Sequence, residues 1–263
     1  MRGPRPPGRL PSMIDLDSLR LPDHPRSAQY DPTWMIDGCM GPNPLWLLED
    51  LLADLPLRTG DRVLDLGCGQ GLTSVFLARE YGVQVFACDL WVKPTENLRR
   101  FTEAGVDDRA FPIHAEARDL KFAKGYFDAA ISVDSYQYFG TDALYLSYLA
   151  PFVRKGGYIG IAVPGVQREV DTPPEWLVPH WEHDFAVFHS AEWWETHWTR
   201  PGQVEVLSVK EAPNAVENWR TWSAACAEHA KSDFVRKMSA QTVAMLDADA
   251  GRTFAFPLVV ARV

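Results

Sequence analysis

The stretch "VLDLGCGQG", Val63 to Gly71, decides the fold of this chain. It runs from an apolar segment into a polar turn, which contains Asp65 and, at alternate positions, Gly67, Gly69 and Gly71. The apolar segment predicts a buried β-strand, and "LTSVFLAREYG", which follows the turn, predicts a helix that ends at a glycine. A strand, a tight glycine turn and a helix in this order open a βαβ unit.

The same alternation continues along the chain. Strands are expected at residues 62–66, 83–90, 109–117, 127–135, 156–163, 203–209 and 253–263. Helices are expected at 43–57, 72–82, 94–106, 142–153 and, as one long stretch, 214–246. Alternating strands and helices predict right-handed crossovers, and the continuous apolar strands suit a sheet that is buried on both faces. The sequence thus predicts an α/β fold: a doubly wound, seven-stranded, mostly parallel sheet with an antiparallel edge strand.

The glycine turn departs from both common phosphate-binding patterns. A dinucleotide fingerprint needs a third glycine where this chain has Leu72, and a phosphate loop needs a lysine that the sequence Gly71-Leu72-Thr73 lacks. Asp65 would repel a pyrophosphate but could accept hydrogen bonds from a cationic amine. Asp89, at the end of the second strand, suits the two hydroxyls of a ribose. The expected ligand therefore carries an amine, a ribose and a base but no phosphates, which describes S-adenosylmethionine.

In these features the chain resembles the class I S-adenosylmethionine-dependent methyltransferases, over residues 45–163 and, through the seven-strand order, as far as Val263. The resemblance implies a Rossmann-like methyltransferase fold, S-adenosyl-L-methionine as cofactor, and methyl transfer by in-line displacement. The cofactor-binding residues that it implies are Asp65, Gly67, Cys68 and Gly69 at the methionine moiety, Asp89 at the ribose, Leu90, Trp91, Glu116 and Ala117 at the adenine, and Asp134 near the transferable methyl. Glu116 replaces the aspartate that is commoner in the family.

Two other functions fit the same turn. A nicotinamide-dependent oxidoreductase would have a similar sheet, but Leu72 at the third glycine position weighs against it. A non-catalytic S-adenosylmethionine-binding protein, such as a regulatory subunit, would keep the cofactor pocket and turn over no acceptor.

Candidates for catalysis lie in two segments. Tyr138, in the loop after the fourth strand, could position the acceptor or relay a proton. Lipid cyclopropane synthases have a Glu-His pair in this loop, whereas this chain reads Gln137-Tyr138, so their carbocation chemistry is not expected. Farther along, His180 and His183 are candidate general bases.

The other histidines of that second segment have a structural explanation. His189 and His197 flank or belong to a helix with Ser190 as its N-cap, so both are expected to support the fold. The spacing of His180 and His183 would permit a metal ligand pair. No metal site is expected, because one such pair is weak evidence.

The expected organisation is a leader and N-terminal arm at residues 1–42 and a methyltransferase domain at 43–263, with a substrate-lid insertion at 164–202. The insertion is too long for a simple crossover, and its many aromatic residues suit either a lid core or an aromatic, apolar or cationic acceptor. In the arm, Trp34, Met40 and Gly41 are candidates to close over the cofactor.

Composition limits the classes of partner that this chain is expected to bind. The formal net charge is −9, which disfavours nucleic acid and anionic membranes, so a small-molecule acceptor is the expected partner. The four cysteines show no disulfide or metal spacing, and the first twelve residues are no secretory signal, so a cytoplasmic protein is expected. Met13 is an alternative start. Nothing in the sequence supports a particular oligomer, although a dimer is possible.

Overall fold

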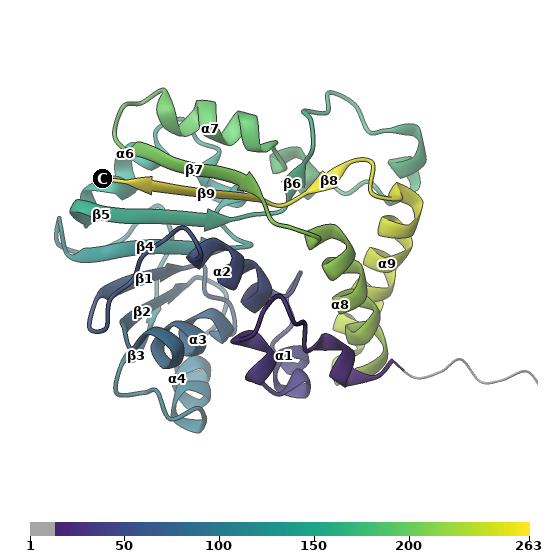
Figure 1. Cartoon of the computed structure of the whole chain (residues 1–263), viewed down its shortest axis with the longest axis horizontal. Coiled ribbons are helices and arrows are strands. Elements are labelled where there is room, and N and C mark those ends of the chain that lie inside the picture. The colour runs from purple at the N-terminus through teal and green to yellow at the C-terminus, as the bar shows by residue number, and fades with distance from the viewer. Residues whose placement is uncertain (1–13) are drawn as a thin grey trace, which may run out of the picture.

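The computed structural model describes residues 14–263, which fold around a seven-stranded sheet (Figure 1). Its strands are β1 (Arg62–Leu66), β2 (Gln84–Asp89), β3 (Ala110–His114), β4 (Phe127–Val133), β5 (Val153–Ala162), β7 (Glu205–Glu211) and β9 (Pro257–Arg262), in the order β3-β2-β1-β4-β5-β9-β7. The seven-stranded doubly wound sheet is confirmed. The expected leader and the alternative start at Met13 lie outside the described residues.

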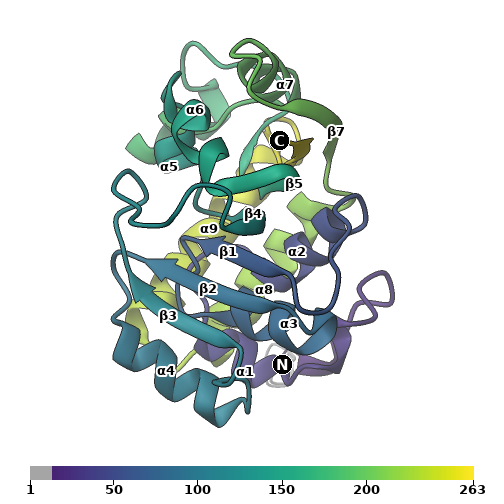
Figure 2. The same cartoon turned by 90° about the vertical axis from the view of Figure 1, so that its left-hand side faces the viewer.

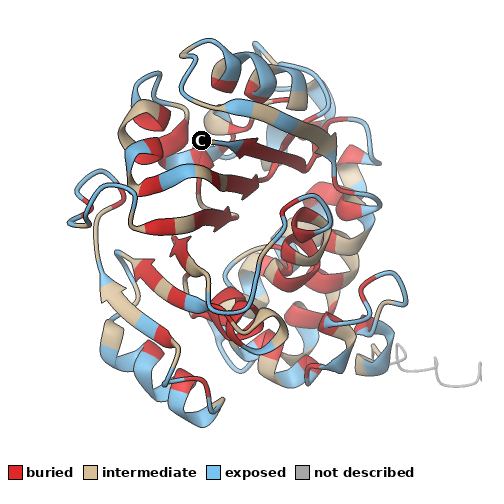
Figure 3. Cartoon of the chain, turned by 60° about the vertical axis from the view of Figure 1, so that its left-hand side comes forward, coloured by how far each residue is buried: buried red, intermediate tan, exposed pale blue. Residues whose placement is uncertain are grey.

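The parallel part of the sheet fixes where a ligand would bind. β1 pairs with β2 on one side and with β4 on the other, so that Val63 is opposite both Val85 and Ala129. The chain order therefore reverses at β1 and β4, and the carboxyl ends of these strands form the usual ligand crevice of a doubly wound sheet. Figures 2 and 3 show these central strands side by side, with mainly buried residues.

The antiparallel pair lies at the expected edge of the sheet. β9 runs antiparallel to β5, with Val260 opposite Gly160, and antiparallel to the outermost strand β7, with Val259 opposite Val209. β9 is buried along most of its length because it lies between two strands and beneath helices.

The helices of the first half largely follow the predicted pattern. They are α2 (Pro44–Leu52), α3 (Leu72–Tyr81), α4 (Pro94–Glu103), α5 (Gln137–Gly140) and α6 (Tyr145–Leu149). Asn43 caps α2 by accepting hydrogen bonds from the backbone N–H groups of Leu45 and Trp46. The helix expected at 142–153 was too long: α6 gives way to a 3-10 turn at Ala150–Phe152, which includes Pro151, a residue without a backbone donor.

The single helix expected at 214–246 is wrong. The chain forms two helices instead, α8 (Ala215–His229) and α9 (Asp233–Asp249), which pack against each other as a hairpin (Figure 1). Ala230 is extended, and the Ser232 side chain caps α9 by accepting from the N–H of Val235. The cap starts a new helix at a point where the apolar periodicity alone predicts a continuous one.

The segment at 164–202 contains two structurally different parts. Its first part holds β6 (Gly165–Val166), which pairs with β8 (Phe254–Ala255), and two 3-10 helices, η4 (Glu175–His180) and η5 (His183–Val187). Its second part is α7 (Ala191–Thr199), which packs on β7 and β9. Trp194 and Trp198 of α7 are fully buried, so α7 belongs to the core of the domain.

The N-terminal arm is irregular with short helices, as expected: η1 (Leu16–Leu19), η2 (Ser27–Gln29) and α1 (Pro32–Asp37). Its end is held against α8, because Trp222 Nε1 donates a 3.0 Å hydrogen bond to the carbonyl of Gly41. The arm therefore connects the glycine-turn half of the molecule with the α8–α9 hairpin. Within residues 14–263, no helix is long and apolar enough to cross a membrane.

Candidate active site

The glycine turn between β1 and α3 leaves no room for a side chain at Gly67 or Gly69. Gly67 and Gly69 have φ angles of +73° and +51°, which favour glycine. A Cβ on Gly67 would collide with Ser135 Oγ, and one on Gly69 would lie 2.9 Å from Met40 Sδ. Both glycines line the cavity described below, so their backbone can lie directly against a ligand.

Asp65 holds the turn against α3. Its carboxylate is buried and accepts hydrogen bonds from Thr73 Oγ1 at 2.7 Å and Ser74 Oγ at 2.6 Å. Burial raises the pKa of Asp65 to about 6. Asp65 does not line the cavity described below, so its visible partners are these two hydroxyls of the protein. A direct contact with the methionine moiety stays a prediction.

Asp89 joins the end of β2 to the glycine turn. One carboxylate oxygen accepts from the N–H of Gly69 at 2.8 Å, and the other accepts from Trp91 at 2.7 Å and Val92 at 2.8 Å. Asp89 also lines the cavity, and carboxylate oxygens can accept further hydrogen bonds. The side chain is thereby fixed in place while it keeps acceptor capacity for a ligand.

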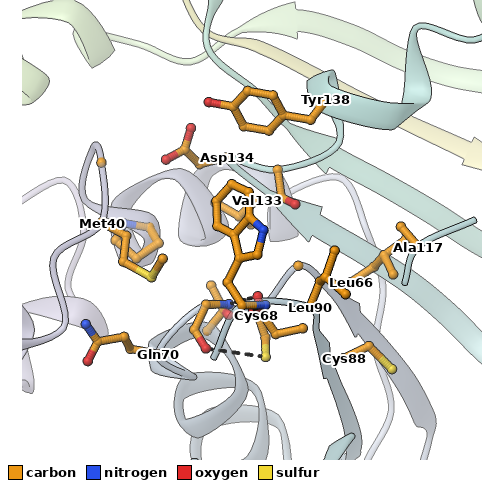
Figure 4. A pocket seen from close by; sticks show the side chains of 18 of the residues that line it. Met40, Leu66, Cys68, Gln70, Cys88, Leu90, Ala117, Val133, Asp134 and Tyr138 are labelled. Carbon is orange, nitrogen blue, oxygen red and sulfur yellow. Dashed lines mark hydrogen bonds between the residues drawn. The ribbon is translucent and has the colours of Figure 1, made fainter. Parts of the chain in front are cut away.

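A cavity of about 260 Å³ opens above the turn (Figure 4). It brings together nearly all of the expected cofactor residues: Gly67, Cys68, Gly69, Asp89, Leu90, Trp91, Glu116, Ala117 and Asp134. Met40, Gly41 and Tyr138 line it as well, so the arm does reach the cavity. Trp34, the other arm candidate, instead stacks on Tyr30, with 5.5 Å between the ring centroids.

Two apolar residues flank the part of this cavity that the sequence assigns to adenine. Leu90 is 45% exposed and Trp91 is 76% exposed, and both line the cavity. Glu116 lies in the same lining and forms an ion pair with Arg118 at 3.5 Å. Exposed apolar side chains beside an open cavity suit a flat ring that would cover them.

Cys68 is no nucleophile candidate. Burial and the neighbouring carboxylates Asp65 and Asp89 raise the pKa of its thiol, so the reactive thiolate is disfavoured. All four cysteines, Cys39, Cys68, Cys88 and Cys226, are free and buried.

Asp134 lies at the end of β4 with a left-handed backbone, at a φ of +52°. Aspartate tolerates this conformation better than most residues, and such conformations cluster at functional sites. Its Oδ1 accepts from Gln137 Nε2 at 3.4 Å, and its Oδ2 faces Gly41 so closely that a Cβ there would collide with it. Burial raises the pKa of Asp134 to about 7. The side chain lines the cavity and is half-buried.

A second cavity, of about 330 Å³, adjoins the first. The two share Met40, Gly41, Pro42, Asp134 and Tyr138. The remaining lining comes from the segment before α7 and from the α8–α9 hairpin, and includes His180, Trp181, Glu182, Asp184, Phe185, Phe188, Trp219, Ser223, Met238, Ser239, Thr242 and Met245. Figure 4 shows Asp134 and Tyr138 on the opposite side of the first cavity from Gln70 and Cys88.

The two cavities separate the candidate catalytic residues. Tyr138 lines both cavities and His180 lines the second. His183 is exposed and lines neither cavity. It is the first residue of η5, which buries the side chain of Phe185 instead. Burial, together with Asp134, Asp184 and Glu182, raises the pKa of Tyr138 to about 12, so this phenol stays protonated near neutral pH.

His189 and His197 are structural, as expected. His189 Nδ1 lies 2.8 Å from Glu169 Oε2, and its ring stacks on Trp193 with 3.7 Å between the centroids. His197 Nε2 lies 2.9 Å from the carbonyl of Gly140. Within residues 14–263, no group of three or more His, Cys, Asp or Glu residues is arranged to hold a metal.

Tyr136, next to the catalytic candidates in sequence, belongs to the core. It is fully buried and packs against Trp198 and Trp194, at centroid distances of 5.6 Å and 5.7 Å. No motif in the sequence predicts that α8 and α9 contribute to the site. Trp219, Ser223 and Met245 lie on ordinary amphipathic helices, and only the folded hairpin brings them to the second cavity.

The comparisons with known proteins agree with this geometry. Residues 63–157 match the model of a family described as a methyltransferase domain, Methyltransf_25. The matched region is a methyltransferase domain of the class I S-adenosylmethionine-dependent type. The methyl donor of this family is S-adenosyl-L-methionine, which decides against the nicotinamide alternative.

Several relatives of this methyltransferase chain are curated. The 27-O-demethylrifamycin SV methyltransferase of Amycolatopsis mediterranei is 31% identical over 44% of this chain and 43% of its own length. The fatty-acid O-methyltransferase of Mycolicibacterium smegmatis is 30% identical over 48% of this chain and 43% of its own length. The demethylmenaquinone methyltransferase of Clavibacter sepedonicus is 31% identical over 65% of this chain and 62% of its own length. The chain thus spans less than two thirds of the length of these relatives.

Solved structures share the fold at lower identity. Phosphoethanolamine N-methyltransferase 2 of Haemonchus contortus matches 95% of this chain and 60% of its own, with a TM-score of 0.72 and 19% identity. The [4+2]-cyclase SpnF matches 86% of this chain and 83% of its own, with a TM-score of 0.66 and 19% identity. These matches concern the fold alone.

Proposed function

We propose that this chain transfers the methyl group of S-adenosylmethionine to a small molecule, with the donor in the first cavity and the acceptor in the second. The observation that carries the proposal is the junction of the cavities at Asp134 and Tyr138. A displacement needs the two reactants side by side in a fixed orientation, and adjoining cavities provide that arrangement.

The residues of the first cavity fit the donor. Gly67 and Gly69 line this cavity without side chains of their own, so the methionine portion can lie directly against the backbone of the turn. Asp89 retains acceptor capacity for ribose hydroxyls, and Leu90, Trp91, Glu116 and Ala117 surround the space for the adenine. When bound, the donor supplies a methyl group on a positively charged sulfur.

The chain's own residues then orient the acceptor and handle its proton. Tyr138, which stays protonated, donates a hydrogen bond at the junction of the cavities. His180 is a candidate base on the acceptor side. The arm lines both cavities and the α8–α9 hairpin lines the second, so that together they limit the access of water to the acceptor.

The proposal extends to the whole chain. Residues 43–263 form the catalytic domain, and the part of the 164–202 segment before α7 forms the wall of the acceptor cavity. A negative chain without a described basic surface suits a cytoplasmic enzyme that acts on a small molecule and binds neither nucleic acid nor membranes.

Calorimetry with S-adenosylhomocysteine tests the donor half. The wild type is expected to bind with a stoichiometry of one. Asp89→Ala should lose more than tenfold in affinity, because hydrogen bonds to a charged group contribute about 1.5–3 kcal/mol. Asp108→Ala, an exposed aspartate that pairs with Arg109, is the matched control and should bind like the wild type. A folded wild type that binds no S-adenosylhomocysteine contradicts the proposal.

The alternative that remains is a protein that binds the donor without transferring its methyl group. The [4+2]-cyclase SpnF is similar in fold, so a protein named for another activity also has this fold. Release of S-adenosylhomocysteine with a panel of acceptors decides between the two: turnover supports the enzyme, and binding without any turnover supports the alternative.

A further inference from the structure

The second cavity has a negative lining. Asp134, Glu182 and Asp184 contribute carboxylates, and among the described residues no lysine or arginine lines this cavity. His180 is the sole imidazole in the described lining. A cavity with this charge attracts a cation and repels an anion.

Aromatic rings stand beside these carboxylates. Trp181 packs edge-on against Phe185, with 5.4 Å between the centroids, and Phe185 packs on Phe188 at 5.0 Å. Trp219 contributes a ring from α8, on a different element of the same cavity. Ring faces attract cations, and their carbon surface also buries an apolar body.

Asp134 is a half-buried carboxylate that has no cationic partner among the described residues. Its Oδ1 accepts a hydrogen bond from the neutral amide of Gln137, at 3.4 Å. Removal from water without a positive charge nearby raises the pKa of Asp134 to about 7. A cationic ligand at the junction of the cavities would stabilise its ionised form.

The cation that these carboxylates would attract is part of the acceptor and is not the sulfonium of the donor. Glu182 and Asp184 line the second cavity but not the first, so their charge acts on the acceptor side. Both carboxylates also contribute to the raised pKa of Tyr138, which lies at the junction. The acceptor side therefore has negative charge of its own.

We propose that the acceptor is an amine on an apolar or aromatic body, and that the chain catalyses N-methylation. This proposal rests on the proposed function and adds the class of acceptor. The amine enters as an ammonium ion and gives a proton to Asp134. Its nitrogen lone pair then forms the new N–C bond while the C–S bond breaks, and the sulfur keeps the bonding electrons. The methylated product leaves as an ammonium ion, and Asp134 releases to water the proton that it accepted.

The same lining disfavours the acids that other methyltransferases accept. A carboxylate or phosphate acceptor would face Asp134, Glu182 and Asp184 with no described cation to neutralise it. Desolvating an unpaired anion beside like charges is strongly unfavourable. Specificity for amines over acids therefore comes partly from repulsion.

Matched pairs of amines and acids test this inference. Calorimetry on the full chain, saturated with S-adenosylhomocysteine, would compare 2-phenylethylamine with 3-phenylpropanoate, tryptamine with indole-3-propanoate, and octylamine with nonanoate. Each amine is expected to bind at least tenfold more tightly than its acid. Binding of any acid as tightly as its amine, or binding of no amine, overturns the proposal.

Variants locate the effect. Glu182→Gln/Asp184→Asn, both exposed and safe for folding, should weaken amine binding several-fold, and Asp134→Asn should weaken it further. Asp171→Asn/Glu175→Gln removes the same charge from exposed residues of the same segment outside the cavity, and should change nothing. Equal effects of the two double variants would contradict a local role of the cavity acids.

The readouts separate this inference from the proposed function. S-Adenosylhomocysteine binding that persists while acids outcompete amines overturns only the choice of acceptor. Loss of S-adenosylhomocysteine binding in the wild type overturns the proposed function. With methyl-labelled donor, label in the amine product supports both.

Discussion

At the scale of single residues, the site depends on where carboxylates are buried. Asp65 accepts hydrogen bonds from two hydroxyls and holds the turn against α3, and Asp89 is fixed by backbone N–H groups. Asp134 lies at the junction of two cavities with one amide donor. Identical side chains thus have three different roles, and the difference comes from their partners.

Asp134→Asn should change how stability depends on pH. The carboxyl is protonated in the folded state up to about pH 7 but ionises near 3.8 when unfolded, so its contribution to stability is full at low pH and is lost as the pH rises through 7. The wild type without ligand should lose on the order of 2 kcal/mol or more relative to the variant between pH 4 and 8. Urea unfolding at both pH values measures this difference.

The Asp134→Asn variant keeps the pH dependence of stability that Asp65 contributes, which has the same sign. Asp65, with a pKa raised to about 6, is present in both proteins, so the difference between them isolates Asp134. Asp171→Asn, at an exposed position, should follow the wild type. Parallel curves for the wild type and Asp134→Asn would show that Asp134 is not buried as described.

Gly67→Ala should destabilise the chain more than Gly60→Ala. Both glycines have positive φ angles, +73° and +87°, so both variants incur backbone strain of about 1 kcal/mol. At Gly67 the new methyl group also collides with Ser135, whereas nothing lies within 4 Å of a Cβ at Gly60. Urea unfolding should give the larger loss for Gly67→Ala, and equal losses would show that the turn has spare room.

At the scale of elements, the acceptor cavity is made by parts that lie far apart in the sequence. The segment before α7 is held to the end of α9, because Trp176 Nε1 donates to Asp249 Oδ1 at 3.2 Å and Arg252 stacks over the Trp176 ring at 4.0 Å. The hairpin and this segment therefore form one wall, and the size of the cavity depends on both.

Thr242→Trp should fill the acceptor cavity and leave the donor cavity intact. Thr242 lines the second cavity and not the first. Calorimetry is expected to show at least a tenfold loss of 2-phenylethylamine affinity with unchanged S-adenosylhomocysteine affinity. Ala240→Trp, on the exposed face of the same helix, is the control. A loss of both affinities in Thr242→Trp would mean that the two cavities do not accept separate ligands.

The elements differ in how well the sequence predicts them. The strands and the turn after β1 are predictable because apolar runs and glycines act locally. The break between α8 and α9 depends on the Ser232 cap, which interrupts a continuous apolar pattern. Trp219 lines the second cavity, whereas His183 lines neither cavity. Both positions depend on long-range packing, which local periodicity does not encode.

At the scale of the whole molecule, the arm, the sheet and the α8–α9 hairpin enclose adjoining cavities. A ligand that binds only the folded state stabilises it by about 2.7 kcal/mol at a concentration of 100 times Kd. S-Adenosylhomocysteine should therefore raise Tm by about 5–10 °C, whereas NAD at the same concentration should not. A thermal-shift experiment that gives the reverse result would favour a nicotinamide site.

A crystal structure with S-adenosylhomocysteine tests the central claim most directly, namely that the donor lies in the first cavity and faces the second. The account predicts ribose hydroxyls on Asp89, the adenine between Leu90 and Glu116, and the sulfur toward Asp134 and Tyr138 at the junction. A ligand whose sulfur points away from that junction, or one bound outside the glycine-turn cavity, would contradict the account.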